Sequence, residues 1–455
     1  MAKDSRRETL TKLNESAATD HARWTYEGGQ PFGDGSVQSY RMGNGLKVLL
    51  LVDKSAPVVS YFTWFSVGSR HEKPGKTGLA HLFEHLMFNE TEGLKAGEFD
   101  RKLEENGAES NAATWVDWTY YYESLPADRF ALAVKLESER MARLVLREPQ
   151  VTSEKEVVAN ERRYRVDDDV EGTASELLYK TAFAKHPYHW PTIGWMADIQ
   201  AFTPEDCESF YKTYYAPNNA LIVIVGDVRE PDVLEKLRDA YGVLPPSEIP
   251  AEDAHPEPPQ TEERREEIRK PTATEKIMVG YHGPAIGDAD HAALTVLNEI
   301  LFGGRASRVH RALVFEKELA SEIRGWVSTF RDPGLYELYA TAREKYTTSD
   351  LLTAMDIELA KVRDQIVSED ELARAKARLE LAALQALEST SGKAEQIGFY
   401  EVVLGDPGGA LRRLEAYRRV TANDLRKAAR RYLTDSSRTV IAILPETETA
   451  SEAAQ

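Results

Sequence analysis

The chain has 455 residues, 42% of them hydrophobic, and carries a formal net charge of −18 at pH 7. This length exceeds what one ordinary hydrophobic core supports, so two large domains or four smaller ones are expected. The acidic balance disfavours nucleic acids and anionic membranes as partners, because both are themselves negatively charged.

Cys207 is the only cysteine, which excludes an intrachain disulfide and a structural zinc site built from cysteines. The first 24 residues are polar and charged, without the apolar core of a secretory signal. The sequence also lacks an apolar run long enough to span a bilayer. We therefore expect a cytoplasmic protein without a membrane partner, with a processed periplasmic form as the alternative.

The N-terminal part is predicted to lead into two strands. Residues 1–35 carry glycine- and proline-bearing turns and are expected to be flexible. Gly43-Asn44-Gly45 is a hairpin signal, and it precedes an apolar strand predicted over 46–52. A second strand, rich in aromatic and β-branched residues, is predicted over 58–65.

Residues 78–90 contain the pattern H-x-x-E-H within a predicted helix. The helix is indicated by apolar residues at spacings of three and four: Leu79, Leu82, Phe83 and Leu86. His81 and His85 are four residues apart, so they lie one turn apart on one face. Glu84 follows His81 by three residues and points the same way.

Two imidazoles placed in this way can bind one metal ion, and Zn²⁺ suits imidazole nitrogen. H-x-x-E-H is the inverted zincin signature, which makes His81 and His85 ligands of one zinc ion per chain and Glu84 the catalytic general base. The alternative is a helix with two surface histidines, but ionisable groups beside a core stripe would then need other partners. A catalytic zinc also needs a third protein ligand.

The third ligand is expected from another helix. A helix is predicted to begin at Ser153, with Glu156 completing a capping box. Glu154 and Glu161 are seven residues apart and share one face of this helix. Either carboxylate could reach a metal, and spacing alone does not choose between them.

Further elements are predicted along the first half of the chain. They are helices over 97–106, 127–145 and 202–215, a hairpin of 108–115 with 118–125, and a buried strand over 221–225.

A composition shift divides the chain. Residues 245–270 are rich in proline and then in charge, and are predicted to be a linker between an N-terminal domain, 1–244, and a C-terminal domain, 271–455. Residues 202–225 align without gaps on 420–443, at an offset of 218 residues. The sequence therefore predicts two similar α+β halves.

Only the first half carries the metal motif. In an alignment of the two halves, the three motif residues fall on Thr295, Asn298 and Glu299. The second half is thus expected to supply structure or substrate contacts and no second zinc site.

These motifs resemble the pitrilysin/insulinase family of zinc metallopeptidases, and in particular the processing-peptidase-like members with subunits of about this length. The resemblance rests on residues 78–90, 110–114 and the spacing of Glu154 and Glu161, and it extends over nearly the whole chain, duplication included. It implies two homologous halves, each a mainly antiparallel sheet covered by helices, that form half of a clamshell-shaped peptidase chamber.

The resemblance also implies a role for individual residues. Glu161 corresponds to the third zinc ligand and Glu154 to a supporting carboxylate. An edge strand is expected to bind a peptide substrate by β-augmentation through Asn111, Ala112, Ala113 and Thr114. The implied reaction is zinc-dependent hydrolysis of oligopeptides or unfolded segments, in which Glu84 takes a proton from water and passes it to the leaving amine.

One feature departs from the family pattern. An Arg and a Tyr seven residues apart are expected in the second half, but Val314 and Ser321 occupy these positions. An apolar side chain cannot stabilise a developing oxyanion. We therefore favour a heterodimer whose homologous partner supplies the Arg/Tyr pair.

Three alternatives to the heterodimer remain. One is a homodimer or monomer with weak or altered activity, and another is partial substitution of the missing pair by the nearby Arg308 or Arg311. The third is a non-catalytic structural or core-type subunit that retains zinc.

Overall fold

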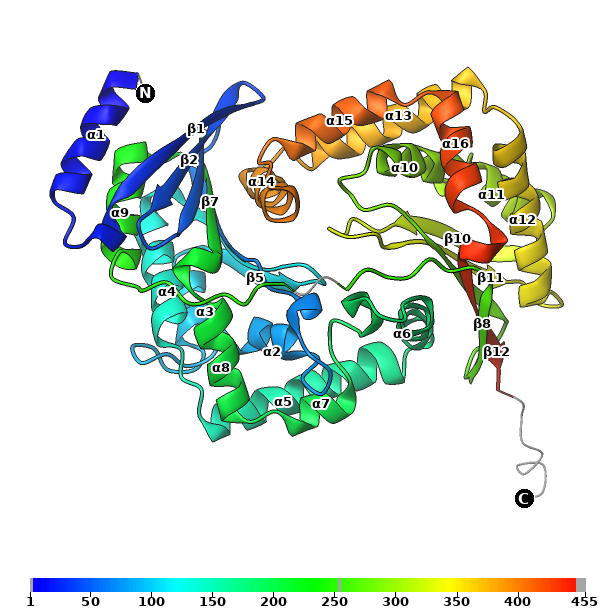
Figure 1. Ribbon diagram of the computed structural model, residues 1–455, viewed down its shortest axis with the longest axis horizontal. Helices are drawn as coiled ribbons and strands as arrows, with labels where there is room; N and C mark the ends of the chain where they lie inside the picture. The colour runs from blue at the N-terminus through cyan, green and yellow to red at the C-terminus, as the bar shows by residue number, and fades with distance from the viewer. Residues whose placement is uncertain (1–2, 253–254, 447–455) are drawn as a thin grey trace. The chain divides into compact units, whose positions relative to one another are not determined.

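The computed structural model describes residues 3–252 and 255–446 and divides the chain into two compact units, each with a β-sheet packed by helices (Figure 1). The first unit comprises 1–160, 191–253 and 383–412, and the second comprises 161–190, 254–382 and 413–455. The fold is therefore mixed α+β, as predicted. Within the described residues, no helix is long and apolar enough to cross a membrane.

The first unit contains a seven-stranded sheet in the order β1-β2-β3-β7-β4-β6-β5. All neighbouring strands are antiparallel except the parallel pair β3 and β7. The strands are β1 (Trp24–Phe32), β2 (Gly35–Met42), β3 (Lys47–Val52), β4 (Val58–Phe65), β5 (Glu109–Thr114), β6 (Thr119–Pro126) and β7 (Ala220–Gly226).

The strongest strand patterns are confirmed. All seven residues of β7 are buried, as its central place between β3 and β4 requires. The predicted strands over 46–52 and 58–65 match β3 and β4. The turn before β3 uses Gly45 at φ +94°, a conformation that favours glycine, and Met42 N donates to Leu46 O at 2.8 Å.

The expectation for residues 1–35 is wrong. This segment forms α1 (Lys3–Glu15) and β1, which pairs with β2 along its length. Asn14 connects the two elements, because its side chain accepts from Trp24 N at 2.7 Å and donates to Trp24 O at 2.9 Å. In β1 only the end residues Trp24 and Phe32 are buried, so the strand shows no clear apolar alternation.

The helices of the first unit include most of those predicted. They are α2 (Leu79–Leu86), α3 (Glu98–Glu104), α4 (Phe130–Arg143), α5 (Glu148–Arg162), α7 (Met196–Ala201), α8 (Pro204–Tyr214), α9 (Glu230–Tyr241) and α14 (Thr390–Leu404). The boundary between the two units falls inside α5, after residue 160. The predicted start at Ser153 is wrong, because α5 begins at Glu148 and Ser153 lies inside it. Pro149 is tolerated there, since the first turn does not use its missing N–H.

The second unit contains a five-stranded sheet in the order β10-β11-β9-β12-β8. Its strands are β8 (Arg264–Lys270), β9 (Lys276–His282), β10 (Ala320–Val327), β11 (Leu335–Ala342) and β12 (Arg438–Pro445). Strand β8 corrects the predicted linker over 245–270, whose last seven residues pair in parallel with β12. β8 is a mostly exposed edge strand, so its sequence is as highly charged as that of a solvent-exposed loop.

The duplication is visible in both sheets. The order β8-β12-β9-β11-β10 repeats β3-β7-β4-β6-β5, with the parallel pair at the same place. Helix α16 (Ala422–Tyr432) repeats α8, and both begin with a capping box. In one box Thr203 N donates to Asp206 at 3.1 Å, and in the other Thr421 N donates to Asp424 at 3.0 Å.

The compact units do not follow the predicted boundaries at residues 244 and 271. Helix α6 (Val170–Ala182) belongs to the second unit, where its Leu178 packs against Gly280 of β9. Helix α14 belongs to the first unit, where Gly398 lies against the indole of Trp64 in β4. Each unit thus contains one helix from the other half of the sequence.

The remaining helices lie in the second half of the sequence. They are α10 (Ala289–Phe302), α11 (Arg308–His310), α12 (Thr348–Asp364), α13 (Glu369–Gln385) and α15 (Gly409–Arg419).

Candidate metal centre

Helix α2 begins at a closely packed loop. Gly78 has φ +96°, and a Cβ at this position would lie 2.6 Å from the carbonyl oxygen of Ile193. The buried Glu72 carboxylate caps the helix, because its two oxygens accept from Gly78 N and Ala80 N, each at 2.8 Å. This cap was not predicted, because it depends on how the loop before the helix folds back.

The apolar face of α2 fixes the helix against the sheet. Leu82, Phe83 and Leu86 are fully buried, as their spacing predicted. The hydroxyl of Tyr121 in β6 donates to Phe83 O at 2.9 Å. These contacts determine the direction in which the polar residues of the helix point.

The structure brings the three predicted ligands together. The rings of His81 and His85 have centroids 5.0 Å apart. One ligand atom from each of His81, His85 and Glu161 lies within 4.8 Å of the others, and this is the one such cluster within residues 3–252 and 255–446. Two imidazole nitrogens and one carboxylate oxygen form a donor set that fits a catalytic zinc ion with an open position.

Glu161 stands in the last turn of α5. Arg165, one turn further along the chain, lies with its Nε 2.9 Å from Glu161 Oε1. Its side chain is 70% exposed, so the pair is solvated and its contribution to stability is small. The spacing of four residues between Glu161 and Arg165 on one helix is itself a sequence signal for such an ion pair.

Glu154, on helix α5 like Glu161, lies beside His85 of α2. Its Oε2 is 3.7 Å from His85 Nδ1, and its Oε1 accepts from Asn89 Nδ2 at 3.1 Å. A carboxylate beside one ring nitrogen is a common means of orienting a metal-binding imidazole. Asn89 was not predicted to take part in the site.

A pocket of about 330 Å³ adjoins this centre in the first unit, and we call it the His85 pocket. It is lined by His85, Phe88, Asn89, Ala96, Gly97, Asp100 and Glu154. Burial raises the pKa of the Asp100 carboxyl above its ordinary value.

The predicted substrate strand is an edge strand. β5 ends the seven-stranded sheet and pairs only with β6 in that sheet. Asn111 is exposed, Ala112 and Ala113 are half-buried, and Thr114 is buried. One side of the β5 backbone is therefore open to another strand.

The second unit shows the surroundings of the two departures from the family pattern. Val314 is buried in the apolar core, and Ser321 is exposed near the start of β10. Arg308 forms two bonds to the carboxylate of Glu371, at 2.7 and 2.8 Å, and Arg311 Nε lies 2.9 Å from Glu316. Both arginines thus already have carboxylate partners.

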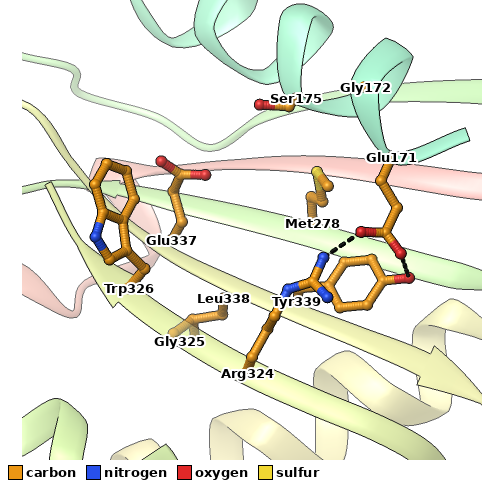
Figure 2. A pocket seen from close by; sticks show the side chains of 10 residues that line it. All are labelled: Glu171, Gly172, Ser175, Met278, Arg324, Gly325, Trp326, Glu337, Leu338 and Tyr339. Carbon is orange, nitrogen blue, oxygen red and sulfur yellow. Dashed lines mark hydrogen bonds and ion pairs between the residues drawn. The ribbon is translucent and has the colours of Figure 1, made fainter. Parts of the chain in front are cut away.

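The second unit also has a pocket of about 330 Å³ that sequence reasoning missed (Figure 2). At one end, Arg324 stacks on the ring of Tyr339 at 4.0 Å and pairs with Glu171. Near the exposed Trp326, Glu337 accepts from Tyr179 Oη at 2.5 Å, and burial raises the pKa of its carboxyl to about 7.

Two family models match the chain. The model described as insulinase, peptidase family M16, matches residues 47–194, which include the H-x-x-E-H motif. The model described as the peptidase M16 inactive domain matches residues 201–379, which lie mostly in the second half.

Individual relatives cover nearly the whole chain. A zinc protease, PqqE, of Helicobacter pylori is 31% identical over 90% of this chain and 93% of its own. The beta subunit of the mitochondrial processing peptidase of Blastocladiella emersonii is 25% identical over 90% of this chain and 89% of its own.

Solved structures show the same fold. A protease from Helicobacter pylori has a TM-score of 0.86 at 31% identity, covering 90% of this chain and 99% of its own. The periplasmic protease PqqL from Escherichia coli has a TM-score of 0.73 at 19% identity, covering 92% of this chain but only 48% of its own. With both halves matched and near-complete coverage by a relative above 30% identity, the chain belongs to the insulinase family of peptidases, peptidase family M16.

Proposed function

We propose that the chain is the zinc-bearing subunit of an endopeptidase that hydrolyses oligopeptides or unfolded segments. The observation that supports this most directly is the convergence of His81, His85 and Glu161, with Glu84 on the same helix. When bound, zinc supplies Lewis-acid chemistry, which lowers the pKa of a water molecule and polarises a carbonyl oxygen.

Different residues carry out proton transfer, metal binding and peptide binding. Glu84 accepts a proton from water as the water oxygen bonds to the carbonyl carbon, and it delivers that proton to the nitrogen as the C–N bond breaks. His81, His85 and Glu161 hold the metal, and Glu154 with Asn89 orients His85. The peptide lies along β5, where Asn111, Ala112, Ala113 and Thr114 offer backbone hydrogen bonds that depend little on side-chain identity.

A homologous partner is part of this proposal. Val314 and Ser321 offer no cation or phenol at the two expected positions, while Arg308 and Arg311 are held by Glu371 and Glu316. One relative is itself named a subunit, and PqqL is about twice as long as this chain. We infer that a second subunit supplies the Arg/Tyr pair and completes a peptidase chamber.

The same two positions favour one alternative, a non-catalytic subunit that retains zinc. In that role Glu84 would have no chemical task, although the metal ligands would remain. The alternative therefore differs from the enzyme in one measurable respect, which is the consequence of changing Glu84.

The test combines zinc content with peptidase activity. The purified chain, alone and mixed with a homologue that carries the Arg/Tyr pair, is assayed on short unfolded peptides with and without a chelator. Glu84→Gln should retain zinc and reduce the hydrolysis rate by about 10²–10⁴-fold, because one general base is lost. His81→Ala should lose zinc, and the exposed Glu92→Gln should change neither property.

The outcomes separate the proposals. Chelator-sensitive activity only in the mixture supports the two-subunit peptidase. Equal activity of the chain alone refutes the need for a partner. Zinc binding without hydrolysis in either arm favours the non-catalytic subunit, and full activity of Glu84→Gln refutes the role given to that carboxylate.

A further inference from the structure

We propose that Arg162 and Glu176 are positioning residues of the metal centre, because the ion pair between them holds the end of α5 and so fixes the place of Glu161. This inference rests on the proposed function and adds two residues to which that function assigns no role. Both act through the ligand that precedes Arg162 in the chain, and neither is expected to touch the reacting atoms.

Glu161 stands in the part of its helix that is least well held. α5 ends at Arg162, one residue after Glu161. The last turn of a helix lacks part of its hydrogen bonds, and helix ends fray. A metal ligand, in contrast, must be held within about 0.5 Å of its productive position. Glu161 therefore needs support from outside its own helix.

The chain leaves α-helical geometry directly after this ligand. Arg163–Asp167 form a π-helical turn, after which Asp168 N donates to Arg163 O, five residues earlier, at 2.8 Å. Such turns are rare, and they occur frequently at functional sites. Because the turn does not extend the α-helical hydrogen bonds of α5, the support for Glu161 has to come from side chains.

The ion pair supplies this support. Arg162 is 5% exposed, and both of its terminal nitrogens donate to the Glu176 carboxylate, Nη1 to Oε2 at 2.7 Å and Nη2 to Oε1 at 3.0 Å. Two parallel bonds fix the orientation of a guanidinium as well as its distance. Separating two largely buried charges is costly, so the pair is persistent. It ties the end of α5 to helix α6, which carries Glu176.

Helix α6 is itself firmly held on the second sheet. Near its start, Glu171 accepts a hydrogen bond from the hydroxyl of Tyr339 at 2.6 Å. Near its end, the hydroxyl of Tyr179 donates to Glu337 at 2.5 Å. Both partners lie on β11, so the helix that receives Arg162 is fixed at two points along its length.

The segment between the two helices is closely packed against α6. A Cβ at Gly172 of α6 would lie 2.0 Å from the carbonyl oxygen of Arg165. The hydroxyl of Thr173 donates to Val166 O at 2.6 Å. Since the π-helical turn has little room to move, the pair of Arg162 with α6 completes a rigid connection that begins one residue after Glu161.

The pair also controls the charge next to the ligand. Arg162 follows Glu161 directly, and a cation beside a ligand carboxylate competes with a metal ion for its negative charge. Glu176 balances the charge of Arg162. Asp167 could replace Glu176 only in part, because it lies 3.5 Å from Arg162 Nη2 and is 41% exposed. Loss of Glu176 would therefore leave a buried cation for which Glu161 is the adjacent carboxylate.

The pair could instead serve only to join two helices. That role predicts a lower thermal midpoint when Arg162 or Glu176 is changed, and an effect on zinc binding, if any, that does not depend on Glu161. The positioning role predicts weaker zinc binding that requires Glu161. The two explanations therefore differ in what happens when Glu161 is removed first.

The experiment measures the affinity of the full chain for zinc alone, by competition with a chromophoric chelator, at a temperature where circular dichroism shows that each variant is folded. Arg162→Lys keeps the charge but loses the two-pronged geometry, and Glu176→Gln removes the partner charge. Each should weaken zinc binding about tenfold or more, as is usual for residues that orient a metal ligand. Glu156→Gln, an exposed change on the same helix α5, should leave the affinity unchanged.

A second set of variants identifies the route of the effect. Glu161→Gln alone should weaken zinc binding, and adding Arg162→Lys to it should cause no further loss, because the ligand through which Arg162 acts is already gone. With Co²⁺ in place of zinc, Arg162→Lys should shift the visible absorption band of the wild type toward that of Glu161→Gln, since this band reports ligand geometry. If Arg162→Lys does not fold, Glu176→Gln takes its place in both measurements.

The results distinguish the inference from the proposed function. Wild-type zinc affinity and Co²⁺ spectrum in both single variants would overturn the inference, as would an equal loss of affinity with and without Glu161. In either case chelator-sensitive cleavage by the wild type would still support the proposed function. A wild-type chain that binds no zinc would overturn both.

Discussion

Replacing Glu72 by Gln should weaken the cap on the helix that carries His81, Glu84 and His85. In the wild type both carboxylate oxygens accept a backbone N–H at 2.8 Å, and Glu72 is 7% exposed. An amide has one acceptor oxygen, so one of the two buried N–H groups would face an NH₂ donor. An unsatisfied buried donor costs about 1–3 kcal/mol.

The free energy of unfolding of the first unit should fall by this amount. For a unit of this size the thermal midpoint should drop by roughly 2–12 °C. Differential scanning calorimetry measures the midpoint, and urea titration measures the free energy. Glu105→Gln serves as the control, because the Glu105 side chain is 65% exposed and, within the described residues, accepts no hydrogen bond from a backbone N–H.

Two results would refute this reasoning. A midpoint for Glu72→Gln equal to that of the wild type would mean that water or a neighbour replaces the lost acceptor. An equal loss in the Glu105→Gln control would mean that general surface charge, and not the cap, determines the stability.

Three further changes test other parts of the structure. Arg140→Leu should cost about 3–5 kcal/mol in urea unfolding, because Glu123 and Glu137 would stay buried without a cation, whereas the exposed Arg143→Leu should cost little. Burial raises the pKa of the Glu337 carboxyl to about 7, so its contribution to stability is present below pH 4.5 and lost as the pH rises through 7. Glu337→Gln should therefore remove a decline in the free energy of unfolding of at most about 3 kcal/mol between pH 5 and 8. Gly398→Ala would place a Cβ against the Trp64 indole and should lower the free energy of unfolding by about 1–3 kcal/mol. The loss should be smaller in a Trp64→Phe background, and equal losses in both backgrounds would contradict the contact.

The elements with the clearest local sequence patterns were predicted correctly. The alternating or continuous apolar runs of β3, β4 and β7 and the stripe of α2 are determined by burial of the same residues that made them recognisable. Helix geometry predicted that the rings of His81 and His85 lie side by side on one face of the helix, and their centroids are 5.0 Å apart. The choice of Glu161 over Glu154 did not, because both lie on one helical face, and it depended on the family resemblance.

Other features depend on contacts between distant residues. The strand β8 is charged and mostly exposed, so only its pairing with β12 identifies it. The cap by Glu72 and the support of Glu154 by Asn89 depend on how loops fold back, which periodicity does not encode. The exchange of α6 and α14 between units leaves no local signal, because the sequence of a helix does not state which of two sheets it will pack against.

This exchange explains what the second half contributes without metal ligands. On one face of the first sheet, Phe62, Trp64 and Val223 form an apolar cluster that is completed by Ala394 and Ile397 of α14. A chain ending after residue 253 would leave that cluster open to water, at a cost of about 25 cal/mol for each Å² exposed.

Two of the three counterparts of the metal motif have structural contacts in the second half. Thr295 donates to His291 O at 2.8 Å, and Glu299 pairs with Arg378, so both are engaged within their own unit. The second half therefore supports the first unit through α14, and this support requires the apolar residues of a helix but no histidine at the duplicated positions.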